Sequence, residues 1–128
     1  MLVLGSVDIT SLKKAFVLLD AAIVEAKSDL ERAGAIQYFE YSYELAWKAL
    51  HSTLIVLGKD TLNNPRFVFR EAADNNLLQD PEPWFEFIIY RNKTVHYNEQ
   101  IVTEIFAMLP LFRDSLKDMI RRLEALQA

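Results

Sequence analysis

The chain has 128 residues, a net charge of −4 from 14 basic and 18 acidic side chains, and no cysteine. This length suits one domain that buries its own core, and the acidic balance argues against a protein that coats nucleic acid through a broad basic surface. Without cysteine, the chain has no disulfides, no thiolate nucleophile and no cysteine-ligated zinc.

The sequence indicates neither a targeting segment nor a membrane span. Residues 1–6 are too short for a signal peptide. Charged residues interrupt every apolar run before it reaches the ~18 to 20 residues of a membrane-spanning helix. We therefore expect a soluble, cytoplasmic protein that forms one domain over residues 1–128.

An all-α fold is expected, because 52% of the residues are hydrophobic and only 3 Gly and 4 Pro are available for strand-and-turn architecture. Apolar residues at steps of three and four predict a first helix over about 11–28, after the cap candidates Thr10 and Ser11. A second, longer helix should end at Gly58, which suits a left-handed C-terminal cap. Its apolar stripe consists of Ile36, Phe39, Tyr43, Trp47, Leu50, Leu54 and Leu57.

Proline and asparagine mark the starts of three further helices. Asn64-Pro65 opens a short one that ends near 74–76, and the run 80–83 opens a fourth. Asn98 is the cap candidate of a last long helix, which Pro110 should kink. The sequence therefore predicts an up-and-down helical bundle of four long helices and one short one.

The end of the fourth helix carries the most informative pair of side chains, Arg91 and His96. A permanent cation beside a group that titrates near neutrality suits phosphate chemistry. On a continuous helix the two would lie about 140° apart and could not converge. The β-branched residues Thr94 and Val95 indicate that the helix ends after Arg91 and before His96. His96 could then turn back towards Arg91 at a corner between two helices.

Four stretches of the chain form a pattern in a fixed order and spacing. They are Phe39-Glu40-Tyr41-Ser42-Tyr43-Glu44-Leu45-Ala46-Trp47-Lys48, Pro65-Arg66, Arg70-Glu71-Ala72 and Arg91-Asn92-Lys93-Thr94-Val95-His96. On these stretches, and over about residues 8–125, the chain resembles the HEPN superfamily, and within it the nucleotidyltransferase substrate-binding proteins that are encoded beside minimal nucleotidyltransferases.

The resemblance implies a HEPN-like homodimer with two Arg-His corners facing one another across a cleft, and a cognate minimal nucleotidyltransferase as partner. Active HEPN proteins are metal-independent endoribonucleases, and several are toxins whose partner nucleotidyltransferase is the antitoxin. Cleavage through the 2′-hydroxyl needs a base, an acid and a cation, which two subunits with one such histidine each would supply. No cofactor or metal is expected.

The resemblance also implies roles for single residues. His96 would transfer the proton, and Arg91 would stabilise the phosphorane oxygens. Asn92 would bind phosphate or orient the imidazole, with Lys93 in support. Glu40 and Glu44 lie one turn apart, and one of them could hold Arg91 or fix the histidine tautomer. Alternatively, Glu40 and Glu44 have no role in a site and simply form a polar stripe on the helix surface, where Lys48 would pair with Glu44.

Tyr97 marks a departure from the family pattern. Many members have a tyrosine two residues beyond the histidine, which in some systems the partner modifies with AMP. Here Tyr97 follows His96 directly and Asn98 occupies the second position. Tyr97 therefore lies on a different side of the turn, although it remains the candidate acceptor.

Three functions stay open. The first is a ribonuclease of a toxin–antitoxin pair, and the second is a non-catalytic subunit that presents a nucleotide or other substrate to a partner nucleotidyltransferase. The third is a helical scaffold or dimeric adaptor. Arg91 would then be a cation at a helix C-terminus and His96 a hydrogen-bonded turn residue. The aromatic side chains of the apolar stripes, Trp47 among them, are expected in the core or an interface.

Overall fold

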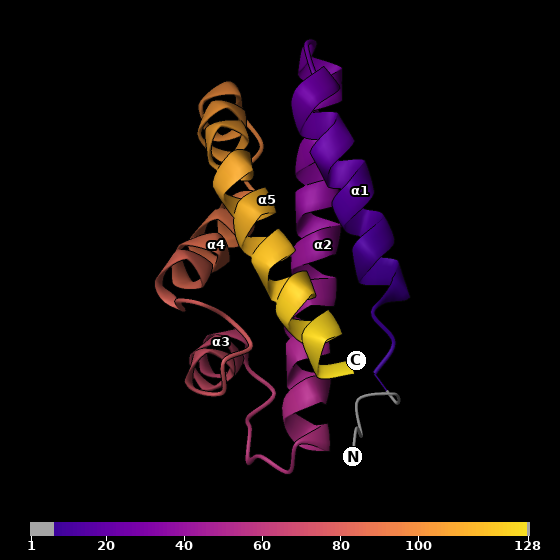
Figure 1. The fold of residues 1–128 in the computed structure, drawn as a ribbon. Helices are drawn as coiled ribbons and strands as arrows, with labels where there is room; N and C mark the ends of the chain where they lie inside the picture. The colour runs from indigo at the N-terminus through magenta and orange to yellow at the C-terminus, as the bar shows by residue number, and fades with distance from the viewer. Residues whose placement is uncertain (1–6, 128) are drawn as a thin grey trace.

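The computed structural model describes residues 7–127, which form five α-helices and no β-strand. The helices are α1 (Thr10–Glu25), α2 (Asp29–Val56), α3 (Pro65–Asp74), α4 (Glu82–Lys93) and α5 (Glu99–Gln127). The predicted all-α bundle is therefore confirmed. In Figure 1, α1 runs alongside α2, α5 crosses them, and α3 and α4 contact α2 on the side away from α1.

None of these helices, within the described part of the chain, combines the length and the apolar character that crossing a membrane requires.

The junction between α1 and α2 differs from the predicted boundary at residue 28, because Ser28 is the N-cap of α2 rather than the end of α1. Ser28 Oγ accepts a hydrogen bond from the backbone N–H of Glu31 at 3.1 Å, and Glu31 accepts one from the backbone N–H of Ser28 at 2.9 Å. This capping box satisfies two donors that the helix start would leave unpaired. At the start of α1 it is the Asp8 carboxylate, not Thr10 or Ser11, that accepts from a backbone N–H.

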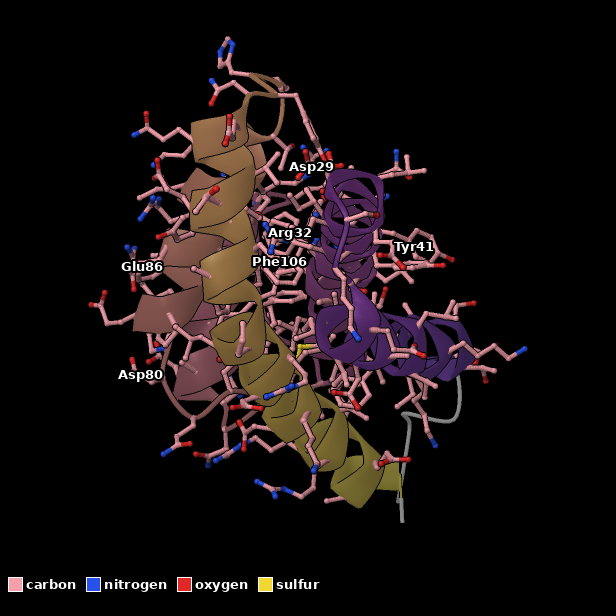
Figure 2. All side chains as sticks on the ribbon, turned by 90° about the horizontal axis from the view of Figure 1, so that it is seen from above. Asp29, Arg32, Tyr41, Asp80, Glu86 and Phe106 are labelled. Carbon is pink, nitrogen blue, oxygen red and sulfur yellow. The ribbon has the colours of Figure 1, made fainter. Side chains whose placement is uncertain are left out.

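The remaining predicted helix ends are confirmed. Asn64 accepts from the backbone N–H of Phe67 at 3.2 Å and Asn98 from that of Ile101 at 2.9 Å, so both asparagines cap their helices. Gly58 follows α2 with φ of 77°, the left-handed conformation expected of it. Pro110 lies inside α5, and the helix changes direction along its length (Figure 2), as a residue without an N–H to donate predicts.

A cluster of buried aromatic rings joins four of the helices. The ring of Phe112 on α5 lies 4.8 Å from Phe39 on α2 and 5.1 Å from Phe87 on α4, measured between centroids and with the rings edge to face. Trp84 on α4 extends the cluster to Phe69 on α3 at 5.0 Å. All five side chains are at most 2% exposed. This packing fixes α3 and α4 against α2, and the candidate site lies between these helices.

Two glycines should respond in opposite directions to replacement by alanine. Gly34 lies inside α2, where an added Cβ meets nothing within 4 Å, so Gly34→Ala should raise the free energy of unfolding by about 0.5–1 kcal/mol. Gly58→Ala also meets no atom, but the left-handed backbone should lower stability by about 1–2 kcal/mol. Urea denaturation of both variants measures the difference, and two changes of the same sign would contradict the assigned boundaries of α2.

Candidate functional site

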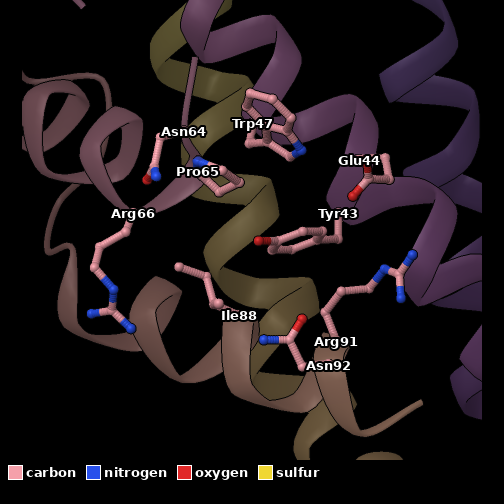
Figure 3. A pocket seen from close by; sticks show the side chains of 9 residues that line it. All are labelled: Tyr43, Glu44, Trp47, Asn64, Pro65, Arg66, Ile88, Arg91 and Asn92. Carbon is pink, nitrogen blue, oxygen red and sulfur yellow. The ribbon is translucent and has the colours of Figure 1, made fainter. Parts of the chain in front are cut away.

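A cavity of about 550 Å³ opens between α2, the start of α3 and α4. Figure 3 shows its walls, to which each of the three segments contributes three residues. They are Tyr43, Glu44 and Trp47 from α2, Asn64, Pro65 and Arg66 from the start of α3, and Ile88, Arg91 and Asn92 from α4. Three residues predicted for a site, Glu44, Arg91 and Asn92, are thus brought together here.

Arg91 is held in the wall by a small polar network. Its Nη1 lies 3.4 Å from Glu40 Oε2 and donates to Thr94 Oγ1 at 3.1 Å. The Thr94 hydroxyl lies 2.9 Å from the same Glu40 oxygen and 2.7 Å from the Arg91 carbonyl, so its single hydrogen serves one acceptor at a time. Thr94 is buried, whereas Arg91 and Glu40 are each about 30% exposed. Glu40 therefore holds Arg91, one of the two roles predicted for the glutamates.

Two aromatic side chains of α2 place polar atoms at the cavity without a partner. Tyr43 is only 3% exposed, yet within the described residues its hydroxyl makes no hydrogen bond. Trp47 Nε1 is likewise buried and unpaired in the same part of the chain. Burial, and then the neighbouring Glu44, raise the pKa of the Tyr43 phenol, which therefore stays a hydrogen-bond donor at neutral pH. The buried Trp47 N–H is costly unless water or a ligand satisfies it, whereas the Tyr43 hydroxyl is accessible from the cavity.

The rim of the cavity carries polar groups with few internal partners. Glu44 makes no ion pair with Lys48 or any other described residue, so the pairing considered from the sequence is absent from the described part of the chain. The Asn92 side chain is exposed and, among the described residues, makes no hydrogen bond. Both side chains can therefore bind a ligand without first losing an internal contact.

His96 lies outside this cavity. As predicted, α4 ends between Arg91 and His96, with its last residue Lys93 and Thr94 as the C-cap. The backbone N–H of His96 donates to the Lys93 carbonyl at 3.0 Å, but the exposed imidazole has no hydrogen bond or ion pair with any described residue. Because the helix ends before His96, this residue does not continue the helical arrangement that carries Arg91. It nevertheless does not line the cavity that Arg91 lines.

Lys93 and Tyr97 belong to other surroundings. Lys93 Nζ lies 3.3 Å from Glu104 on α5 and 5.4 Å from the ring centre of Tyr90. The Tyr97 hydroxyl donates to the Ala33 carbonyl on α2 at 3.2 Å. Burial and the charge of Glu40 raise the pKa of Tyr97.

Tyr97 also lines a second cavity, of about 370 Å³, together with Asp29 and Arg32 at the start of α2 and residues at the start of α5. The Arg32 guanidinium lies 5.4 Å from the centre of the Phe106 ring. Figure 2 labels both residues in the space between α2 and α5. Neither cavity gathers three His, Asp or Glu side chains close enough to hold a metal ion, and no such group occurs elsewhere in residues 7–127.

Five functional candidates were not identified from the sequence as site residues. Tyr43 and Trp47 fell on an apolar stripe and were assigned to the core, although each carries a hydrogen-bond donor that could have signalled a polar edge. Thr94 was interpreted only as part of a helix stop. Asn64 was interpreted as the start of a helix and Arg66 as part of a family motif. Only the folded chain places both in the wall of the cavity that Arg91 also lines.

The fold and the site together are those of an α-helical bundle with a cavity between its second, third and fourth helices. Residues 7–125 match the family described as nucleotidyltransferase substrate binding protein like. The chain therefore belongs to the nucleotidyltransferase substrate-binding protein family, which confirms the resemblance noted in the sequence.

Two solved structures are similar to this chain. One is ttk003001694 from Thermus thermophilus, with 35% sequence identity, a TM-score of 0.81 and coverage of 88% of this chain and 98% of that one. The other is HI0074 from Haemophilus influenzae, with 25% identity, a TM-score of 0.80 and coverage of 91% and 99%. The HI0074 structure is described as revealing the fold of a substrate binding domain of a nucleotidyltransferase. No curated protein matches the chain.

The Thr94 hydroxyl should contribute measurably to stability. Thr94→Val removes the group shared by Arg91 and Glu40, and should lower the free energy of unfolding by about 1–3 kcal/mol, whereas Thr94→Ser should keep most of it. Thr103→Val is the matched control, because its exposed hydroxyl bonds only the Glu99 carbonyl and its loss should change stability by less than about 0.5 kcal/mol. Equal losses for the two valine variants in urea denaturation would show that the network contributes nothing specific.

Proposed function

We propose that this chain is the substrate-binding subunit of a nucleotidyltransferase pair. In this proposal the cavity between α2, α3 and α4 holds the substrate, and a separate nucleotidyltransferase chain transfers a nucleotide to it. The family to which the chain belongs and the printed description of HI0074 support this assignment. The observation that carries it is the composition of the cavity wall, where unpaired donors of Tyr43 and Trp47 meet Glu44, Arg91 and Asn92.

The wall is built for binding rather than for proton transfer. It has donors on its floor, one carboxylate at Glu44 and apolar surface at Ile88 and Pro65, a combination typical of sites that orient a small molecule. Its lining includes no histidine. A subunit that only positions a substrate needs none, because orientation by itself lowers the barrier of a reaction performed by the partner.

The chain reconstituted with its cognate nucleotidyltransferase should transfer labelled nucleotide to an acceptor in a way that depends on this cavity. The double variant Glu44→Ala/Asn92→Ala loses two side chains that make no internal hydrogen bond or ion pair in the described residues, so the fold should be kept. We expect the KM for the acceptor to rise about tenfold or more, with the KM for the nucleoside triphosphate unchanged.

Gln37→Ala is the control for this assay, because Gln37 is exposed on the same helix and does not line the cavity. Size-exclusion chromatography checks that each variant still forms the complex. An unchanged acceptor KM in the double variant would contradict the proposal.

A second candidate function is the metal-independent ribonuclease of a toxin–antitoxin pair, and the exposure of His96 favours it. The imidazole is solvent-accessible and makes no side-chain hydrogen bond within residues 7–127, so a second subunit of a homodimer or an RNA can reach it. In this alternative Arg91 and His96 of two subunits form a composite site. The nucleotidyltransferase would then regulate the chain instead of receiving a substrate from it.

Incubation of the purified chain with RNA in EDTA separates the two candidates. The substrate-binding proposal predicts no cleavage above background. The ribonuclease alternative predicts cleavage that both His96→Ala and Arg91→Ala abolish. His51→Ala is the matched control, because it removes the other histidine of the chain, which packs beside Trp47 at 6.3 Å. Cleavage that survives His96→Ala would indicate a contaminating nuclease and sink the alternative.

A further inference from the structure

The two arginines that line the cavity differ in how far their charge is neutralised. Arg91 is paired with Glu40 at 3.4 Å and bonded to Thr94. Arg66, on the opposite wall, forms no ion pair with any carboxylate in the described part of the chain. An anion entering the cavity therefore gains more from Arg66, because Arg91 would first have to share its charge with Glu40.

Arg66 is also held in place. Its guanidinium lies over the Phe85 ring at 5.0 Å, and that of Arg70, one turn later on α3, lies over the same ring at 5.8 Å. Stacking on an aromatic face restrains the side chain and leaves its N–H edges available. Two restrained guanidiniums on one ring, neither with an acidic partner within residues 7–127, give this end of the cavity a positive charge.

The backbone at the start of α3 adds to this positive end. The ten-residue helix has no acidic residue in its first turn. Pro65 has no N–H and Asn64 caps the N–H of Phe67, so the backbone N–H of Arg66 is left without an acceptor among the described residues. Helix N-termini of this kind favour anions through their N–H groups and their dipole.

The floor of the cavity provides an independent indication of a ligand at the same place. The Tyr43 side chain is 3% exposed, and its hydroxyl points into the cavity towards the side where Pro65 and Ile88 lie (Figure 3). In the described residues this hydroxyl has no hydrogen-bond partner. The ring is buried, but the hydroxyl lies at the cavity surface, so it is free to donate to a molecule that enters.

We infer that the α3 side of the cavity binds a phosphoryl group of the substrate. The guanidinium and the backbone N–H of Arg66, together with the Tyr43 hydroxyl, are the donors. A phosphoryl group fits better than a planar carboxylate, because its tetrahedral oxygens can accept from donors in several directions and it carries up to two charges at neutral pH. The remainder of the molecule would lie against Trp47 and Ile88 and reach Glu44. This inference rests on the proposed function and names the chemical class of its substrate.

Equilibrium binding to the isolated chain tests the inference with four probes: AMP, ribose 5-phosphate, inorganic phosphate and adenosine. Calorimetry gives the affinities, and the fluorescence of Trp47 reports occupancy of the cavity. The phosphate-bearing probe that binds most tightly identifies whether the phosphoryl group comes with a nucleoside, with a sugar or alone. Adenosine, which lacks the group, should bind at least tenfold more weakly than AMP.

Arg66→Gln and Arg70→Gln form a matched pair, because both remove a cation that stacks on Phe85 and only Arg66 lines the cavity. Arg66→Gln should weaken the tightest phosphate-bearing probe about tenfold or more, Arg70→Gln by less than threefold, and Tyr43→Phe severalfold. Equal losses for the two arginine variants, a loss confined to Arg91→Gln, or no binding of any phosphate-bearing probe at millimolar concentration would each overturn the inference.

The proposed function fails by a different result. The substrate-binding proposal is contradicted if the Glu44→Ala/Asn92→Ala variant leaves the acceptor KM unchanged in the transfer assay. Transfer that depends on those two residues but not on Arg66 would leave the substrate-binding function standing, and would show that the substrate has no phosphoryl group on the α3 side.

Discussion

The candidate site depends on the packing of Phe112 against α2 and α4. Its ring meets Phe39 and Phe87 edge to face, so the two helices are held apart by aromatic side chains rather than by small residues. One turn beyond Phe39, Tyr43 still reaches the cluster through Phe39 and Phe69, but its hydroxyl end passes out of it. One turn further, Trp47 is only half-buried. The aromatic series of α2 thus runs from core to cavity floor, and the same side chains that stabilise the fold supply the donors.

The polar groups around the cavity are distributed unevenly, and this has a consequence for how a ligand would be oriented. On the α4 side Arg91 Nη1, Glu40 and Thr94 contact one another, which stabilises the end of α4 against α2, and only Arg91 Nε is left buried without a partner in this group. On the α3 side Arg66 is balanced by no carboxylate in the described residues. A ligand with one anionic end and one end that donates hydrogen bonds would therefore have a preferred direction, with the anion towards α3 and the donors towards Glu44.

The fold could be predicted from the sequence because its signals are local. Caps at Asn64 and Asn98 and the glycine at 58 depend on neighbouring residues only, and each is present as expected. Two local predictions were wrong. The boundary at residue 28 had its own signal in the spacing of Ser28 and Glu31, and at the start of α1 the accepting side chain is Asp8 and not Thr10 or Ser11. Periodicity also placed Tyr43 and Trp47 on the buried face of α2, but it could not show that both side chains line a cavity together with residues of α3 and α4. That depends on contacts between segments far apart in the chain, as does the meeting of Thr94 with Glu40.

The position of His96 could not be predicted for a related reason. A helix stop shows where the backbone ceases to be helical, but not the direction of the residues that follow. Here the chain leaves α4 at Lys93, and His96 is exposed and does not line the cavity. The two candidate functions therefore share Arg91 and differ in their use of His96. The Arg91–Glu40 pair does not decide between them, because the same pair is present whichever function the chain has. What decides is whether a second subunit brings its own Arg91 to the exposed imidazole, since within one chain His96 does not line the cavity that Arg91 lines.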